Sequence, residues 1–188
     1  MNVFDIIGPI MIGPSSSHTA GAVRIGAITR QLLAVEPFNV SISFYGSFAK
    51  TYKGHGTDKA IIGGLLGMST DDECLRDSID IAASRGMKYE VHLMENKCEH
   101  PNAAFIEAEG KLEEKVSILG FSIGGGNVVI KKLNGTDVEF TAQFNTLIVP
   151  HYDLPGTIAA ITTIFGKQDI NIASVSYTHL TLPTIYSV

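Results

Sequence analysis

The second half of the sequence is a series of short segments with strand-like patterning, and this feature constrains the fold most. We expect strands at 89–93, 104–108, 116–123, 128–133 and 138–140. Asn134-Gly135 separates the last two segments and is a strong signal for a type I′ hairpin turn. The Gly124–Gly126 run precedes a strand and lacks the Lys-Ser/Thr of a phosphate loop, so we interpret it as a bulge or hairpin corner. The sequence therefore predicts an antiparallel sheet.

The first half of the sequence is typical of helices, with one strand between them. Apolar periodicity predicts a helix from the serines at 15–17 to about Val35. Alternation over 40–45 predicts a strand, and a helix follows from Thr57 through Leu65. A further short helix is expected at 77–84. Helices and an antiparallel sheet in these proportions place the chain in the α+β class.

Composition excludes several functional classes. The 188-residue chain has a net charge of −5 and no basic run, so we expect no nucleic-acid binding. No apolar segment approaches the roughly 18 residues of a membrane span, and the N-terminal segment lacks the basic region of a signal peptide. We therefore expect a cytoplasmic protein that is not bound to a membrane. Cys74 and Cys98 form no CxxC pair and cannot supply the four thiolates of an iron–sulfur cluster, so no metal site is expected on this chain.

The segment GPSSSHTAG places hydroxyls and an imidazole directly before the first predicted helix. Serines in this position are natural N-caps, and the first amides of a helix attract anions. Ser15, Ser16, Ser17, His18 and Thr19 are therefore candidates for a site that binds a small anion. The alternative interpretation is a plain helix cap with surface hydroxyls.

A second histidine, His55, lies between two glycines in KGHGTDK. Glycines on both sides suit an unusual backbone conformation or close approach to a ligand. An imidazole held there could act as a general base, with Lys50 near enough in sequence to balance a carboxylate. The alternative is a flexible surface loop. Asn102, in the His100-Pro101-Asn102 segment that opens a strand, offers both a donor and an acceptor.

The C-terminal part of the chain, from residue 143, has a pattern of its own. A strand at 146–149, a helix at 157–165 and a strand at 169–175 are predicted around the loop HYDLPG. Asp153, Pro155, Gly156 and the later Ile-Asn-Ile at 170–172 resemble the opening βαβ of a ferredoxin-like ACT domain. The resemblance is partial, because the segment from about 177 does not continue the ACT pattern. His151, Asp153 and Gly156 are the candidate effector-binding residues.

Four motifs in series resemble the β chain of iron–sulfur-dependent L-serine dehydratase. They are GPSSSHTAGAVRIG, YGSFAKTYKGHGTDKAIIGGLLG, HPN and SIGGGNVVI, and the resemblance covers about residues 3–142. It implies a β-chain domain at 1–142 followed by an ACT-like segment at 143–188. It also implies elimination of water from L-serine, giving aminoacrylate and then pyruvate and ammonia, a reaction that feeds gluconeogenesis.

The same resemblance implies a partner and a cofactor. The [4Fe–4S] cluster of the family is held by cysteines of an α chain, so we expect an αβ assembly, in oligomeric form, with its site at the subunit junction. An open iron position can act as a Lewis acid toward the substrate hydroxyl. The residue roles expected on this chain are His55 as base with His18 as the second choice, Ser15, Ser16, Ser17 and Thr19 on the substrate carboxylate, and Lys50, Asp58 and Asn102 completing the pocket.

Two other functions stay open on the sequence. The family fold resembles the allosteric substrate-binding domain of D-3-phosphoglycerate dehydrogenase, which suggests a non-catalytic amino-acid sensor that binds L-serine. Alternatively, an aberrant end beyond residue 177 would leave Ile158 and Ile161 without a partner sheet and give an inert fragment prone to association.

Overall fold

The computed structural model describes residues 9–152 and 154–178. The chain divides into two compact units, Met1–Gln143 and Phe144–Val188. Each unit is described by itself below. Among the described residues, none of the helices has both the length and the apolar character needed to cross a membrane.

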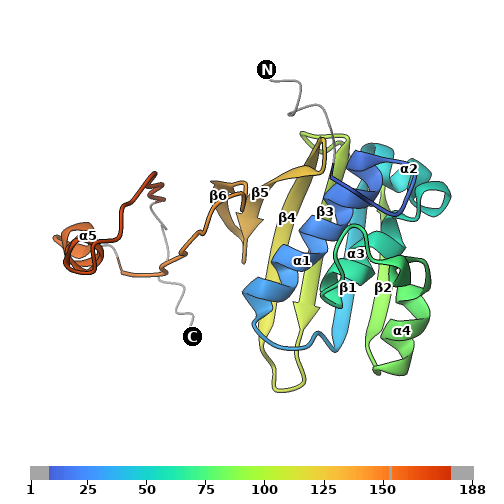
Figure 1. The fold of residues 1–188 in the computed structure, drawn as a ribbon, viewed down its shortest axis with the longest axis horizontal. Coiled ribbons are helices and arrows are strands. Elements are labelled where there is room, and N and C mark those ends of the chain that lie inside the picture. Colours follow the sequence, from blue (N-terminus) through green and yellow to red (C-terminus); the bar gives the residue numbers. More distant parts are fainter. Residues whose placement is uncertain (1–8, 153, 179–188) are drawn as a thin grey trace. The chain divides into compact units, whose positions relative to one another are not determined.

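The first unit is built on a six-stranded sheet with the order β2-β1-β3-β4-β5-β6 (Figure 1). Its strands are β1 (Asn39–Tyr45), β2 (Lys88–Met94), β3 (Asn102–Glu109), β4 (Lys115–Gly124), β5 (Asn127–Leu133) and β6 (Thr136–Phe140). From β1 through β3 to β6, neighbouring strands pair antiparallel, whereas β1 and β2 pair parallel. The α+β class is confirmed, but the sheet is mixed, so the expectation of a purely antiparallel sheet was wrong.

The parallel pair follows from what lies between its strands. Parallel neighbours need a crossover of a dozen or more residues, usually helical, whereas antiparallel neighbours can be joined by tight turns. The chain between β1 and β2 contains α2 (Gly46–His55), α3 (Thr57–Leu65), the 3₁₀ turn η3 (Glu73–Asp77) and α4 (Ser78–Ser84). These helices give the crossover its length, and β2 becomes an edge strand beside β1.

The tight turns agree with the sequence. Asn134 and Gly135 both have positive φ, 49° and 80°, as a type I′ turn requires, and they join β5 to β6. Gly124, Gly125 and Gly126 all have positive φ and form the corner between β4 and β5, where the register of the pair shifts. The interpretation of the glycine run as a hairpin corner with a bulge is confirmed.

The core lies between the sheet and the helices. Alternate residues of β1, Val40, Ile42 and Phe44, are buried, whereas their neighbours along the strand are exposed or half-buried. Helix α1 (Gly21–Leu33), preceded by the π-helical turn η2 (Ser16–Ala20), packs across β3, β4 and β5 (Figure 1). The largest fully buried side chains of this core include Phe44, Phe48, Ile25, Ile42, Ile61, Ile62, Leu65, Ile106, Ile118 and Ile130.

Helices α1 and α3 approach each other closely through glycines. A Cβ atom at Gly64 would lie 2.0 Å from the Val23 carbonyl oxygen, and one at Gly26 would lie 2.2 Å from the Ile61 carbonyl oxygen. Either contact is far shorter than real Cβ atoms tolerate. Backbone therefore packs directly on backbone where the two helices cross.

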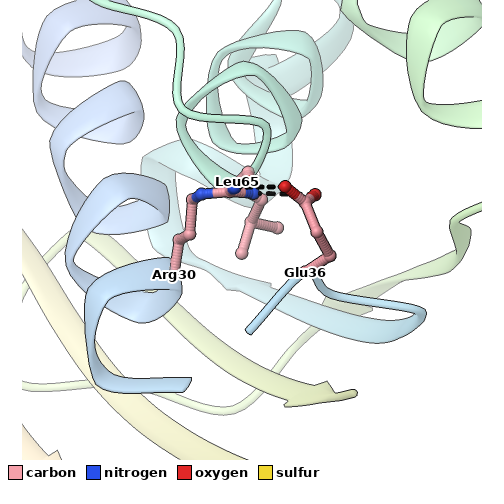
Figure 2. Close-up of polar contacts among 3 residues, drawn as sticks. All are labelled: Arg30, Glu36 and Leu65. Atoms are coloured by element: carbon pink, nitrogen blue, oxygen red, sulfur yellow. Dashed lines mark hydrogen bonds and ion pairs between the residues drawn. The ribbon is translucent and has the colours of Figure 1, made fainter. Parts of the chain in front are cut away.

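A charged side chain ties the far ends of the same two helices together. Arg30 Nη1, from the last turn of α1, donates a hydrogen bond to the Leu65 carbonyl oxygen of α3 at 2.9 Å and another to Glu36 Oε2 at 3.0 Å (Figure 2). Arg30 Nη2 also pairs with Glu36 Oε1. The guanidinium thus caps the C-terminal end of α3, where backbone carbonyls lack helical partners.

The second unit contains the helix α5 (Thr157–Lys167). The helix was expected at 157–165, but the segments 146–149 and 169–175 are not strands in the structure, so those two predictions were wrong. A strand is stable only beside other strands, and the described part of this unit offers no sheet for them to join. Its large apolar side chains are accordingly exposed, among them Phe144, Leu147, Tyr152, Leu154, Ile158, Ile164, Ile170 and Val175.

Replacing Gly64 by Ala tests the close helix crossing. The new methyl group would meet the backbone of Val23 and Ala27, so α1 and α3 must separate, and we expect a loss of about 1–3 kcal/mol in the free energy of unfolding. The control is Gly54→Ala in α2, where a Cβ has open space and the free energy should be unchanged or rise by up to about 1 kcal/mol. Chemical denaturation of both variants measures the difference; equal midpoints for Gly64→Ala and the unmodified chain would contradict the crossing.

Candidate functional site

The serine-rich segment forms one π-helical turn, η2, directly before α1. Ser15 is its N-cap, and Ser15 Oγ accepts a hydrogen bond from the His18 backbone N–H at 3.2 Å. The Gly21 N–H donates to the Ser16 carbonyl oxygen, five residues earlier, which is the wider spacing of a π-helix. Single π turns of this kind are frequent at functional sites.

His18 projects from this turn into a cluster of hydroxyls. Its Nδ1 atom lies 3.3 Å from both Ser15 Oγ and Ser17 Oγ, and its Nε2 atom lies 3.2 Å from Ser47 Oγ. The ring also packs edge-on against buried Phe48, with the centroids 5.1 Å apart. Both ring nitrogens are therefore within hydrogen-bond distance of serines from two different parts of the chain.

His55 lies beside His18 although 37 positions separate them in the sequence, and their ring centroids are 4.6 Å apart. His55 is the last residue of α2, and the next residue, Gly56, has φ +64° and ends α2 while beginning α3. Thr19 Oγ1 donates to the His55 carbonyl oxygen at 3.5 Å. The Nδ1 atom of His55 is shielded from solvent and has no hydrogen-bond partner among the described residues.

The two imidazoles influence each other electrostatically. Burial, and then the nearby charge of His55, hold the pKa of His18 below its usual value of 6.5. Burial and a second imidazole both disfavour the protonated form. His18 is therefore neutral at pH 7 and above, with one of its ring nitrogens able to accept a proton.

Helix packing explains why these distant segments meet. The turn η2 leads into α1, and Gly56 leads into α3. Because α1 and α3 cross in backbone contact at Gly26 and Gly64, their N-terminal ends carry His18 and His55 to the same place. The sequence indicated each histidine separately, but their convergence depends on this crossing.

Ser47 is a site residue that the sequence analysis missed. It lies in the first turn of α2, its backbone N–H donates to the Pro101 carbonyl oxygen at 2.6 Å, and its hydroxyl contacts His18. No signal in the sequence pointed to it, because its contact with His18 joins residues 29 positions apart. Asn102 is adjacent, because it forms an isolated bridge with Gly46, and its Oδ1 atom is shielded from solvent with no partner in the described structure.

The remaining predicted site residues are Ser16, Lys50 and Asp58. Ser16 is half-buried in η2. Lys50 is exposed on α2. Asp58, in the first turn of α3, accepts a hydrogen bond from the Lys59 backbone N–H at 2.8 Å. Burial, followed by the charge of Asp58, raises the pKa of Tyr89 on β2. The roles proposed for Lys50 and Asp58 stay predictions.

Two hollows in the first unit differ in what lines them. One, of about 200 Å³, is bordered by Thr19, His55 and Gly56 together with the cationic Lys59 and Arg76. Another, of about 570 Å³, lies at the C-terminal ends of α1 and α3, where Arg30 is already engaged by Glu36 and Leu65. We place the site beside the smaller hollow, because His55 and Thr19 line it and His18 packs against His55.

Metal ligands do not gather in the part of the chain that the structure describes, where no group of three or more His, Cys, Asp or Glu side chains could hold an ion. Cys74 is an exposed thiol and Cys98 a half-buried one. In the second unit, His151 Nδ1 lies 2.8 Å from the Tyr152 carbonyl oxygen, and Gly156, with φ +88°, precedes α5. Asp153 lies outside the described residues.

Comparison with known proteins identifies the family of the chain. A probable L-serine dehydratase beta chain of Bacillus subtilis (strain 168) is 48% identical over 174 residues, which are 91% of this chain and 77% of that protein. The chain belongs to the serine dehydratase beta-chain family. The profile of that family, "Serine dehydratase beta chain", matches residues 2–87, which include His18, Ser47 and His55.

Two further relatives show how much of each protein the similarity covers. The L-serine dehydratase beta chain of Peptoniphilus asaccharolyticus is 35% identical over 178 residues, covering 93% of this chain and 79% of that protein. L-serine dehydratase TdcG of Escherichia coli (strain K12) is 28% identical over 77% of this chain but only 37% of its own length. This chain thus aligns with most of the length of two beta chains and with 37% of a longer L-serine dehydratase.

The imidazole pair predicts a specific titration. His18 should titrate below pH 6.5, because burial and His55 both disfavour its cation. His55→Gln should raise the pKa of His18 without restoring the usual value, since burial is the larger cause. Proton NMR of the ring resonances measures both values. A pKa of His18 at or above 6.5 in the unmodified chain would contradict the packing described here.

The same shift has a stability consequence with a definite sign. The folded chain binds the His18 proton less readily than the unfolded chain, so the free energy of unfolding falls as the pH drops through 6.5 and is unaffected by this group above it. We expect His18→Gln to lose less stability than the unmodified chain between about pH 7.5 and pH 5.5. Denaturation at both pH values measures this difference.

Proposed function

We propose that this chain is the β subunit of an L-serine dehydratase, which works with an α chain to convert L-serine to pyruvate and ammonia. The observation that carries the proposal is the His18–His55 pair, whose ring centroids lie 4.6 Å apart beside a helix start lined with hydroxyls. Family membership supports the substrate and the α-chain partner through the names of the relatives. In this proposal residues 1–142 form the dehydratase domain and residues 143–188 an ACT-like regulatory segment.

The elimination requires a base for the α-hydrogen of serine. We assign this role to His55, whose buried Nδ1 atom has no partner among the described residues. The proton moves from Cα to the imidazole of His55 and the Cα–Cβ double bond forms. The Cβ–O bond breaks, and the leaving hydroxide takes up that proton and is released as water. The resulting aminoacrylate tautomerises and hydrolyses to pyruvate and ammonia.

The start of the first helix suits the carboxylate of the substrate. Ser15 and Ser17 present hydroxyls 3.3 Å apart at the N-terminal end of η2, which continues into α1. A helix N-terminus attracts negative charge through its free amides and its dipole. With Ser16 and Thr19, these hydroxyls would orient serine so that its α-hydrogen points to the imidazoles.

His18 has a supporting role in this scheme. Its lowered pKa keeps it neutral at working pH, so it does not repel a proton that arrives on His55. A neutral His18 held by Ser15, Ser17 and Ser47 can accept that proton or share it. Asn102 supplies a buried acceptor nearby that suits the ammonium group of an amino acid. Lys50 and Asp58 would contribute only if substrate or partner binding brings them closer.

We assign the [4Fe–4S] cluster to the α chain. The described residues of this chain do not fit the cluster as ligands, since they bring no group of three or more suitable side chains together. No step above is therefore routed through the cluster. The contribution of this chain is to bind the carboxylate, orient the substrate and move the proton.

Activity of the reconstituted αβ enzyme tests the proposal. His55→Ala should lower kcat by about 100-fold or more, which is the usual contribution of a general base. His92→Ala is the matched control, because His92 is an exposed histidine on β2 that contacts Glu90 at the surface. Pyruvate formation under anaerobic conditions measures both variants.

The outcomes separate the two candidate functions. A His55→Ala enzyme within about threefold of the unmodified one would disprove the assignment of the base. Serine binding by this chain without turnover in any αβ mixture would instead favour the amino-acid sensor, because the same hydroxyls could bind a carboxylate without chemistry. The cheap preliminary observation is a neighbouring gene for an α chain with cluster cysteines.

A further inference from the structure

A buried serine on the sheet forms a hydrogen bond with the π turn. Ser122, on β4, has no exposed surface, and its Oγ donates a hydrogen bond to the Ser17 carbonyl oxygen at 2.9 Å. This bond joins residues 105 positions apart. It connects the sheet directly to the turn that carries His18.

The Ser122 side chain packs directly against the backbone of Gly21. A Cβ atom at Gly21 would lie 2.0 Å from Ser122 Oγ and 2.8 Å from Ser122 Cβ. Only a glycine at position 21 lets the turn come this close to β4. The contact is therefore built by two residues, a small donor on the strand and a glycine on the helix.

The hydrogen bond compensates for the π geometry. In an α-helix the Gly21 N–H would donate to the Ser17 carbonyl oxygen, four residues earlier. Here it donates to Ser16 instead, and the Ser17 carbonyl accepts from Ser122. A buried carbonyl left without a donor is costly, so Ser122 favours the π turn over a regular helical turn.

The bonded carbonyl belongs to the peptide unit that joins Ser17 to His18. That unit is held at both ends, because its oxygen accepts from Ser122 Oγ and its N–H donates to Ser15 Oγ at 3.2 Å. Since a peptide unit is planar, holding both ends fixes its orientation and the position of the His18 Cα atom, from which the imidazole projects. Ser122 thus acts on the imidazole without touching it.

We propose that Ser122 is a positioning residue of the site, which holds the π turn in the conformation that directs His18 toward Ser47 and His55. The consequence for turnover rests on the proposed dehydratase function, whereas the effect on the imidazole does not. Ser122 is the first residue of the SIGGG segment and lies on β4. The residue that positions His18 is therefore on the sheet and not in the turn that carries His18.

Ser122→Ala is the direct test, and Ser78→Ala is its matched control. Ser78 is also fully buried, and its Oγ donates to a helix carbonyl, that of Lys59, at 2.8 Å. Each variant loses one buried hydroxyl donor, so we expect similar falls in Tm, on the order of 2–4 °C. If the two variants have equal Tm values, a difference between them in the His18 resonances or in kcat is due to the position of the lost hydroxyl.

The first readout is the His18 imidazole in the full-length chain, followed by ¹⁵N and ¹H NMR of the ring. Ser122→Ala should shift the His18 ring resonances, because the contacts of Nδ1 and Nε2 with the serines change, whereas Ser78→Ala should leave them in place. His18 resonances of Ser122→Ala that superimpose on those of the unmodified chain would overturn the proposal. This measurement requires no enzymatic activity and stands even if the dehydratase assignment fails.

The second readout is turnover by the αβ enzyme. Ser122→Ala should lower kcat by about 10- to 100-fold, as misplacement of a catalytic group on the ångström scale does, while Ser78→Ala stays within about threefold. Gly21→Ala, which pushes the turn away from β4, should change kcat in the same direction. Equal kcat for the two serine variants would overturn the role in turnover. An inactive unmodified αβ enzyme would instead count against the proposed function.

Discussion

The backbone contact between α1 and α3 is the constraint on which the candidate site depends. Gly26 and Gly64 allow the two helices to cross with no side chain between them, and Arg30 ties their C-terminal ends together. Their opposite ends then carry His18 and His55 to a centroid distance of 4.6 Å. A larger separation of the helices would leave both histidines in place on their own segments but would break their pairing.

The site combines groups that disfavour charge with groups that attract it. Burial and the neighbouring imidazole keep His18 neutral, and His55 Nδ1 and Asn102 Oδ1, which lack partners among the described residues, are shielded from solvent. The helix start a few ångströms away favours an anion. Buried polar atoms without partners are uncommon in proteins and call for an explanation. In the proposed function, the ammonium group of the amino-acid substrate would donate to such acceptors, and its carboxylate would lie at the helix start.

The sequence predicted much of the fold because alternation and turn chemistry are local. The strands after Lys88 and the Asn134-Gly135 turn were found in this way. The parallel pairing of β1 with β2 depends on the route of the helices between them, which local patterns do not encode. The strands expected at 146–149 and 169–175 failed for a related reason, since alternation indicates a strand but cannot supply its partner.

Some residues of the candidate site could also be predicted from local sequence patterns, whereas others could not. Serines before an apolar run and a glycine-flanked histidine are visible in sequence, so His18 and His55 could be identified as candidates. Ser47 could not be distinguished from an ordinary residue at a helix start, and Ser122 from any serine on a strand. Their importance comes from contacts 29 and 105 positions away, which only the packed structure reveals.

The π turn also has a consequence for the phase of the first helix. A π turn holds one more residue than an α turn, and each residue of an α-helix advances the side-chain direction by about 100°. The extra residue in η2 therefore lets α1 keep Ala22 and Ile25 against the core while Ser15 and His18 face the site. In a continuous α-helix, the angle between the face that lines the site and the face that packs on the core would be fixed by the helical repeat. The turn separates them, so the lining of the site and the packing of the core could change independently during evolution.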